Sequence, residues 1–454
     1  MEAPAAGRSP AAPPASMPAA ILGNGSLLAT VSASGRVERM FWPHVDWGQH
    51  LGVLRLGAVG DGDGDVMWLD GAAFTHAQRY DDGAMVLTTR ACARARGFEL
   101  EVTDVVLPDE PVLLRRVVGS RDPFAIAVYC RPELDESDRY GGVYVDAARR
   151  ALVFHRRQRA FALCVLPAAV LACGRADGDP GRSALHALRE RVPARAIEFG
   201  AVDGVVAGRP AREHVVACAF GASPDEALAL AERALVTGFD DARAARARRD
   251  AAVLADALPV QEHVPGLEAL YRRSLLTIDL LSDRSTGAII AAPEFDPEFR
   301  DSGGYGFVWA RDIAFVALAL LAAGRSGPAA AALRWLTRTQ AAEGLWLHRH
   351  WTAGSLAPSW GLHQIDETGV AVFAFEAAWR QLRDAELDRE LWPAARRAAD
   401  FLCGSLDPAT GLPLRSVDLW EERDGQHAYS GAAVSAGLRA AGAMARRHDP
   451  PLAA

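Results

Sequence analysis

Three stretches in the second half of the chain place tryptophan beside carboxylates at the start of an apolar helical pattern. They are residues 303–312 (GGYGFVWARD), 359–369 (SWGLHQIDETG) and 417–425 (VDLWEERDG). Flat aromatic rings stack on the apolar face of a sugar, while carboxylates and arginine bind its hydroxyl groups. A carboxyl group beside an apolar ring also loses solvation, so its pKa rises and it can act as a general acid. Together the three stretches indicate carbohydrate chemistry.

Each stretch alone also has a structural explanation, because acidic residues in a first helical turn favour the helix dipole and tryptophan is common in cores. Their repetition at three such junctions favours a binding site. His348 and His350 could bind a metal, but no third ligand lies at a suitable spacing, so we predict neither a metal site nor a cofactor. The absence of GxSxG and GxGxxG patterns argues against serine hydrolases and dinucleotide enzymes.

The composition argues against several other classes of function. The 454 residues carry 49 basic and 57 acidic side chains, a net charge of −8, without a basic cluster that would indicate nucleic-acid binding. Every basic residue is arginine, so Schiff-base chemistry and the P-loop lysine are excluded. No apolar run approaches the roughly 18 residues of a membrane span. Without a signal-peptide core or paired cysteine spacing, we expect a cytoplasmic protein that binds neither nucleic acid nor membrane.

Two periodicities divide the chain. Short apolar runs alternating with polar residues predict an antiparallel β-sandwich over residues 21–222. The helix N-cap signature at 223–226 (SPDE) then predicts a helical linker over residues 223–262. The alanine- and proline-rich residues 1–20 are expected to be a disordered tail. The last domain, residues 263–454, is predicted to be helical.

This last domain is predicted to contain six helices arranged as consecutive hairpins. Apolar spacing places them at residues 266–282, 311–324, 328–341, 364–383, 388–404 and 429–446. The loops between them carry most of the tryptophan and histidine, and on a helical scaffold function usually lies in such loops.

The three stretches and the opening of the first domain resemble glycoside hydrolase family 15. This family contains glucoamylases, glucodextranases and trehalases, and the resemblance is to its bacterial form with an N-terminal β-sandwich. Residues 304–312 resemble its Trp-x-Arg-Asp loop, 359–369 its second signature and 418–423 its general-acid segment. Residues 21–25 (ILGNG) and 41–43 (FWP) resemble the start of its β-domain. The resemblance covers nearly the whole chain from about residue 20.

The resemblance implies an inverting hydrolase of α-glucosidic bonds that acts on an α-glucan or α-glucoside from the non-reducing end. The activity would be that of a glucoamylase, with trehalase or glucodextranase activity as further options. Arg311 and Asp312 would bind the hydroxyls of the terminal glucose, and Glu421 would be the general acid. The resemblance implies five further substrate-binding residues, which are Trp309, Trp360, Leu419, Trp420 and Glu422. Trp309 and Trp360 would stack on the terminal glucose or close over it, and Glu422 would bind the adjacent sugar. We expect the pKa of Glu421 to be raised by Trp420 and nearby carboxylates.

The family's (α/α)6 barrel has twelve helices, whereas the pattern here predicts six, so we expect a partial barrel truncated before the general-base segment. An inverting glycosidase needs that second carboxylate on the opposite face of the sugar. Hydrolysis by the chain alone should then be weak, and exposed helix faces should favour self-association. Two alternatives stay open. One is a catalytically inactive carbohydrate-binding or complementing subunit, and the other is an inverting glycoside phosphorylase.

Overall fold

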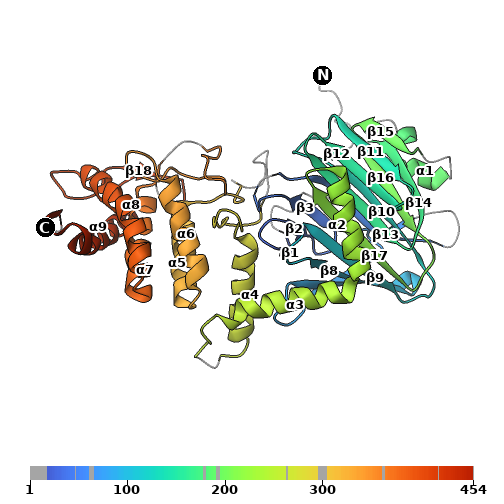
Figure 1. Cartoon of the computed structure of the whole chain (residues 1–454), viewed down its shortest axis with the longest axis horizontal. Coiled ribbons are helices and arrows are strands. Elements are labelled where there is room, and N and C mark those ends of the chain that lie inside the picture. Colours follow the sequence, from blue (N-terminus) through green and yellow to red (C-terminus); the bar gives the residue numbers. More distant parts are fainter. Residues whose placement is uncertain are drawn as a thin grey trace, which may run out of the picture.

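The computed structural model of the protein describes residues 18–46, 48–60, 66–176, 180–190, 195–261, 264–294, 304–359, 363–417 and 419–452. Antiparallel sheets form the first half of the chain and helices form the second half (Figure 1). The predicted order of a β-sandwich followed by helices is therefore confirmed. Residues 1–17 of the expected disordered tail lie outside the described part of the chain.

A nine-stranded antiparallel sheet is the largest layer of the first domain, with strand order β15-β11-β12-β13-β17-β9-β8-β7-β6. In that order the strands are Ile197–Gly200, Gly141–Asp146, Ala151–Arg156, Arg159–Leu166, Glu213–Gly221, Val112–Gly119, Phe98–Val106, Val86–Ala93 and Thr75–Tyr80. In β8, Phe98, Leu100 and Val102 all lie in the main core, as the alternation of a half-buried strand requires.

Two smaller sheets share this core. A five-stranded sheet has the order β14-β16-β10-β4-β5, and a three-stranded sheet has the order β1-β2-β3. The strands are Ala168–Arg175, Val202–Gly208, Ala125–Pro132, Leu51–Val59 and Val66–Trp68, and then Ala20–Gly23, Leu28–Val31 and Val37–Phe41. Leu54 of β4 and Ile126 of β10 pack with β8 in one apolar cluster. The short helices of this domain are η1 (Arg94–Arg96), η2 (Pro180–Arg182) and α1 (Ala184–Glu190).

Two helices follow the last strand. α2 (Pro224–Thr237) begins after Ser223, whose side chain accepts a hydrogen bond from the Glu226 N–H at 3.3 Å, as an N-cap does. Its alanine and leucine side chains pack on the nine-stranded sheet, which α2 crosses in Figure 1. Gly238, at φ 85°, ends α2 and redirects the chain into α3 (Phe239–Ala255). α3 then leads away from the sheets to the helical domain (Figure 1).

The helices of the last domain lie within a few residues of their predicted positions. They are α4 (Leu267–Leu281), α5 (Ala310–Ala322), α6 (Ser326–Thr339), α7 (Ile365–Leu382), α8 (Ala385–Gly404) and α9 (Ala428–His448). A small pair, β18 (Ser416–Val417) with β19 (Asp424–Gly425), lies before α9, and η3 (Pro450–Leu452) follows it. α7 and α9 approach closely at two glycines, because a Cβ on Gly369 would lie 2.4 Å from the Ala433 carbonyl oxygen and one on Gly437 would lie 2.7 Å from the Gly369 oxygen. Among the described helices, none has both the length and the apolar character needed to cross a bilayer.

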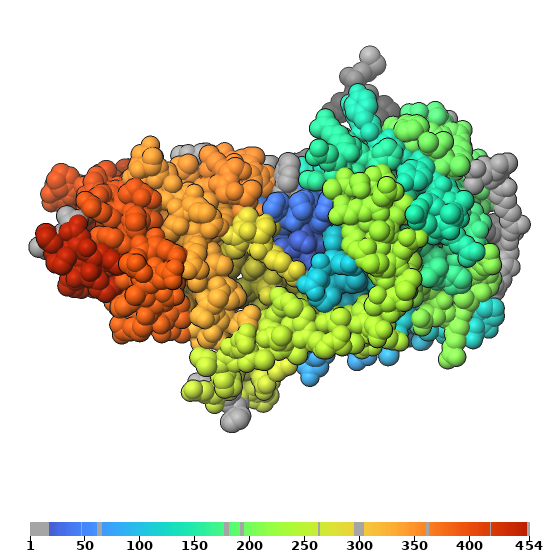
Figure 2. Space-filling view, viewed as in Figure 1, coloured from blue at the N-terminus to red at the C-terminus, as the bar shows by residue number. Residues whose placement is uncertain are grey.

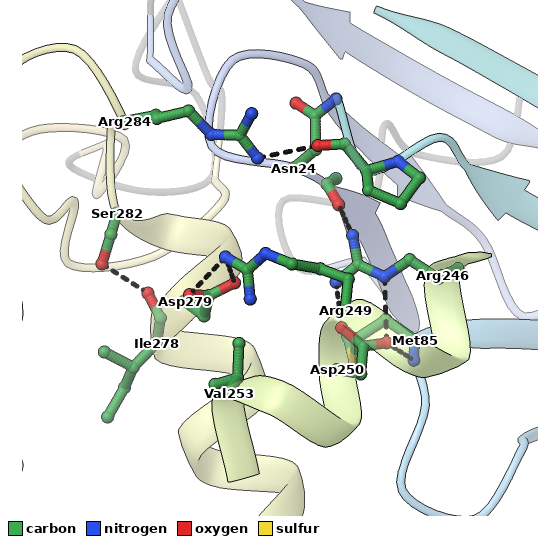
Figure 3. A network of polar contacts seen from close by, with 12 residues as sticks. Asn24, Met85, Arg246, Arg249, Asp250, Val253, Ile278, Asp279, Ser282 and Arg284 are labelled. Atoms are coloured by element: carbon green, nitrogen blue, oxygen red, sulfur yellow. Dashed lines mark hydrogen bonds and ion pairs between the residues drawn. The ribbon is translucent and has the colours of Figure 1, made fainter. Parts of the chain in front are cut away.

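The sheets and the helical domain meet where blue residues of the first strands lie beside yellow residues of the helical domain (Figure 2). A buried ion pair within α3 anchors this junction (Figure 3). Arg246 pairs with Asp250, and their side chains are 1% and 0% exposed. Arg246 Nη1 donates to the Gly23 carbonyl oxygen at 2.6 Å, and the Met85 N–H donates to Asp250 Oδ2 at 2.7 Å. The pair therefore ties the helical linker to β1 and to the turn before β7.

Candidate active site

The starts of α5 and α7 lie together and bring an arginine into a group of carboxylates. Arg311, in the first turn of α5, donates from Nη1 to Asp366 Oδ2 at 2.9 Å and to Gln364 Oε1. Its Nε lies 3.6 Å from Asp312 Oδ2. Burial raises the pKa of Asp312 against the opposing charge of Arg311, and Asp366 and Glu421 add smaller upward contributions. The structure therefore places Arg311, Asp312 and Glu421 within one electrostatic environment.

Glu367, which follows Asp366 in α7, caps the start of α5 with its carboxyl group. The Ala310 N–H, at the first position of α5, donates to Glu367 Oε2 at 3.0 Å, while the N-cap residue Trp309 offers no side-chain hydrogen bond. Helix starts leave such N–H groups without a partner in their own helix. Glu367 is fully buried, and burial raises its pKa well above the usual value although Arg311 opposes this. Glu367 thus acts as a structural support for the arginine-bearing turn.

The loop between α8 and α9 brings Glu421 to the same place. Gln364 Nε2 donates to Glu421 Oε1 at 3.3 Å, and the same oxygen accepts a hydrogen bond from His348 Nε2. The other ring nitrogen of His348 is hydrogen-bonded to Ser359 Oγ. Gln364 also binds Arg311, so a single amide joins Glu421 to the arginine cluster, by which we mean Arg311 with Asp312 and Asp366.

The expected rise in the pKa of Glu421 is wrong. Burial pushes this pKa upward, but the hydrogen bond and charge of His348, with the charges of Arg349 and Arg311, outweigh burial and bring it below its usual value. Trp420, the ring expected to desolvate the carboxyl group, is 74% exposed. Glu421 is consequently an ionised, hydrogen-bonded carboxylate near neutral pH.

The aromatic residues differ in how they are placed. Trp309 is only 4% exposed, and its ring meets the His348 ring edge-on with centroids 6.1 Å apart. Tyr305 packs beside it at 5.8 Å and is itself exposed. Trp309 therefore forms a buried wall next to the histidine that contacts Glu421. Trp360 lies outside the described residues.

The residues on either side of Glu421 lie in an exposed loop. Leu419 is partly buried, whereas Trp420 and Glu422 are exposed on either side of the partly buried Glu421. Glu421 has a positive φ of 63°, an uncommon backbone conformation for a residue other than glycine. This turn directs the Glu421 side chain to the arginine cluster, and its two neighbours lie at the surface.

A hairpin between α6 and α7 carries the histidine that contacts Glu421. Val308 and His350 exchange two backbone hydrogen bonds of 2.9 Å, which attach this hairpin to the residues before α5. Thr352 is fully buried, with its carbonyl oxygen accepting from Trp335 Nε1 at 2.8 Å. Its N–H and hydroxyl donate to Asp46 Oδ2 and Oδ1 at 2.6 and 2.7 Å. A residue of the first domain therefore fixes a loop of the candidate site.

The two histidines considered as metal ligands have other partners. His348 binds Ser359 and Glu421, and His350 packs edge-on against Trp335. Burial lowers the pKa of His350 to about 4. Within the described ranges, no group of three or more His, Cys, Asp or Glu side chains is arranged to hold a metal ion.

Sequence reasoning did not assign roles to several residues that build this site. Gln364, Asp366 and Glu367 lie inside the second Trp-containing stretch, so the signal was an acidic pair in a first helical turn. His348 was considered in the sequence only as a possible metal ligand, and its contact with Glu421 has no local signal because the two residues lie 73 positions apart. Asp46 has no local signal, because its partner Thr352 is 306 residues away in the chain.

Asp46 should make stability depend on pH. Burial raises its pKa to about 6, and nearby Asp283 adds to the rise although the hydrogen bonds from Thr352 oppose it. The folded state therefore binds this proton more strongly than the unfolded state does, and folding stability falls as pH rises from about 4 to about 6. The shift corresponds to roughly 2–3 kcal/mol. Urea unfolding of the wild-type chain and Asp46→Asn across this range should show the variant gaining stability relative to wild type. Parallel curves would contradict the assignment.

The chain thus joins a β-domain to helical hairpins that carry arginine, carboxylates and aromatic rings at the adjoining starts of α5 and α7. Residues 266–453 match the model of glycosyl hydrolases family 15. The chain is thus a family 15-like protein, and the resemblance inferred from its sequence is confirmed.

Two curated relatives and one solved structure extend this match. The chain is 30% identical over 178 residues to an uncharacterized glycosyl hydrolase of Methanocaldococcus jannaschii, covering 39% of this chain and 27% of that protein. It is 30% identical over 185 residues to a glucoamylase of a Clostridium strain, covering 40% of this chain and 24% of that protein. A bacterial glucoamylase in complex with acarbose has the same fold, with a TM-score of 0.80 at 18% identity, over 96% of this chain and 64% of that one. The chain thus spans about a quarter of each curated relative.

Proposed function

We propose that the protein is a glycosidase that removes glucose from the non-reducing end of an α-glucoside with inversion. The observation that carries this proposal is the meeting of Arg311, Asp312 and Glu421 at the adjoining starts of α5 and α7, where Gln364 contacts both Arg311 and Glu421. This combination supplies hydroxyl-binding groups next to a carboxyl group that can exchange a proton.

Arg311 and Asp312 are proposed to bind the hydroxyls of the terminal glucose. Asp366 and Gln364 hold Arg311 through one nitrogen, Nη1, so its guanidinium is oriented before the sugar arrives. The sugar would rest against Trp309. We propose that the rest of the substrate contacts come from Trp360, Leu419, Trp420 and Glu422.

Glu421 is proposed to be the general acid. Its carboxylate needs a proton for this role, yet His348 stabilises the ionised form. A glycosidic oxygen that enters beside Glu421 would displace the His348 hydrogen bond and exclude water. Both changes remove support for the charge, so the pKa of Glu421 would rise when the substrate binds.

Inversion also requires a general base about 6.5–9.5 Å from the acid. Asp366 and Glu367 are fully buried against the arginine and the helix start, so neither can reach a water beside the sugar. Asp312 lies beside Arg311 and is better suited to hold a hydroxyl. Among the described carboxyl groups around Glu421, we therefore propose none as the base.

The exposed rings of Phe315 and Phe373 support a further proposal, that the helical domain self-associates.

Binding of acarbose tests the proposal without requiring turnover. We expect the chain to bind acarbose in isothermal titration calorimetry and Arg311→Gln to weaken binding about 10–100-fold, because hydrogen bonds to a charged group are lost. Arg334→Gln is the matched control, since Arg334 pairs with Glu390 on the surface of the helical domain. Failure of the wild-type chain to bind acarbose would contradict the proposal.

The product identifies the reaction. Release of glucose from maltose, assayed with and without formate as a substitute base, would support hydrolysis. Glucose 1-phosphate formed only with added phosphate would instead support the phosphorylase alternative. Binding without either product would support a carbohydrate-binding subunit.

A further inference from the structure

A cavity of about 210 Å³ lies at the junction between the β-domain and the helical domain. Its walls come from the turn after β1, from α3 and α4, from the residues that follow α4, and from α5 and the start of α6. Three arginines line it, which are Arg249 of α3, Arg284 after α4 and Arg325 directly before α6. Figure 3 shows Arg249 and Arg284 at this junction. Among the described lining residues, neither Arg311 nor Glu421 is present, so the cavity is separate from the candidate active site.

Two of these arginines keep unused hydrogen-bond donors. Arg325 Nη1 donates to the Val253 carbonyl oxygen at 2.6 Å and to Asp256 Oδ2 at 3.2 Å. Arg249 Nη2 donates to the two oxygens of Asp279 at 3.0 and 3.1 Å. The other two guanidinium nitrogens of each arginine have no acceptor among the described residues, and none of these four atoms is fully buried. Since the Arg325 side chain is only 10% exposed, its unused N–H groups are held at the cavity rather than in open solvent.

The carboxylates that line the cavity are already engaged. Asp279 is paired with Arg249. Asp283 accepts at Oδ1 from the backbone N–H groups and hydroxyls of Ser285 and Thr286, and its Oδ2 lies 2.9 Å from His44 Nδ1. These contacts use both oxygens of Asp283, so this carboxylate does not offset the charge of the other two arginines.

The partners of Arg284 and Arg325 lie outside the cavity. Arg284 pairs with Asp109 at 3.4 Å, and Arg325 pairs with Asp256 at 3.2 Å. Asp109 and Asp256 are 86% and 78% exposed and are not among the described lining residues. Pairs with such exposed carboxylates are weak, because water solvates the charges. The cavity therefore has an excess of positive charge, which favours an anionic ligand.

The rest of the lining is aliphatic. Its larger apolar side chains are Val253, Leu275, Ile278, Ile289 and Leu320. An inorganic ion would leave this wall uncovered. Among the described lining residues there is no aromatic ring on which a sugar could stack. A hollow that combines a few charged groups with an aliphatic wall is suited to a ligand with an anionic head and a short hydrocarbon body.

We propose that this cavity binds a small organic acid. Its carboxylate would accept hydrogen bonds from Arg325 and Arg249, since guanidinium groups bind carboxylates through parallel N–H donors. Arg325 contacts the carbonyl oxygen of Val253, one helical turn after Arg249, so the two arginines approach the same part of α3. The aliphatic body would pack against Leu275 and Ile278. Because Arg249 belongs to the linker helix and Arg325 precedes α6, the bound acid would join the linker to the helical domain.

Glutarate and its neutral diamide, glutaramide, test this proposal in calorimetry on the full chain. Glutarate should bind at least about tenfold more tightly than glutaramide, because only the carboxylates pair with the guanidinium charges. Inorganic phosphate at the same ionic strength should bind more weakly than glutarate, because it buries no hydrocarbon. These three measurements need no variant, so they do not depend on how a substitution affects folding.

Variants locate the bound acid. Arg325→Gln and Arg249→Gln should each weaken glutarate binding about 10–100-fold, because hydrogen bonds to a charged group are lost. Arg243→Gln is the matched control and should bind normally, since Arg243 is an arginine of α3 that pairs with Asp81 and does not line the cavity. Arg311→Gln, in the candidate active site, should also bind glutarate normally.

Several results would overturn the proposal. Equal binding of glutarate and glutaramide would show that the guanidinium charges play no part, and phosphate binding as tight as glutarate would show that the aliphatic wall plays none. Loss of binding in Arg311→Gln with normal binding in Arg325→Gln would place the acid in the candidate active site. Absence of glutarate binding would exclude the junction site and would leave the proposed glycosidase function untouched, because acarbose binding tests that function separately.

Discussion

Exchange of Glu421 for glutamine should slow glucose release from maltose by about 10²–10⁴-fold, because a positioned general acid typically contributes this much. Glutamine keeps the size of the side chain and its ability to accept a hydrogen bond from Gln364, but it cannot deliver a proton to the leaving oxygen. Initial rates should be compared under the condition, with or without formate, in which the wild-type chain is fastest. Acarbose binding, measured in parallel, should show that the variant is folded.

Glu390→Gln provides the control for this change. Glu390 is a glutamate of α8 that pairs with Arg334 at the surface. Its exchange should leave the rate within about twofold, since surface pairs contribute little. A Glu421→Gln variant that is as fast as this control would exclude Glu421 as the acid.

The contact with His348 adds a pH dependence to the same prediction. A general acid works in its protonated form, so kcat/KM falls as pH rises through the pKa of Glu421 in the free protein. His348 lowers that pKa, and so do Arg349 and Arg311. In His348→Gln the hydrogen-bonded positive charge is gone, and the falling limb should move to higher pH. A limb that stays in place would show that His348 does not control this carboxyl group.

The fold could largely be predicted because its signals are local. Apolar spacing locates each helix from α4 to α9, and the SPDE signature locates the start of α2 at its capping residue Ser223. The sequence also indicates that the Trp-containing stretches form a binding site. Two of them run straight into the starts of α5 and α7, and the third leads into α9. Contacts between neighbouring helices place such starts side by side.

Other features depend on contacts between distant segments. The sequence beside Glu421 suggests an apolar ring and a raised pKa, but Trp420 turns to solvent and His348, 73 residues earlier, supplies the dominant partner. Burial of Trp309 likewise follows from how the hairpin packs over it. No periodicity in the chain indicates that Asp46 of the β-domain will hold Thr352 of the helical domain. These contacts give the site its electrostatics, so the sign of the pKa shift could not be read from local spacing.

The largest loss of stability is expected at the junction between the two domains. Asp250→Ala would leave the Arg246 guanidinium buried without its counter-charge and the Met85 N–H without its acceptor. Breaking one side of a fully buried pair costs about 3–5 kcal/mol, because the remaining charge stays out of water. Urea unfolding followed by tryptophan fluorescence should show this loss as a lower free energy of unfolding.

Asp279→Ala is the comparison that isolates burial. Asp279 of α4 accepts hydrogen bonds from Arg249 Nη2 of α3 at 3.0 and 3.1 Å. This pair lies at the same junction, but both of its side chains are partly exposed. Its loss should cost about 1 kcal/mol or less, since water can solvate the arginine left behind. A double variant, Arg246→Met with Asp250→Leu, should recover much of the stability lost in Asp250→Ala, because it removes the buried charge together with its partner. If Asp250→Ala were no worse than Asp279→Ala, the buried pair would not be what anchors the linker. The hydrogen bonds to Gly23 and Met85 would then be replaceable by water or by neighbouring groups.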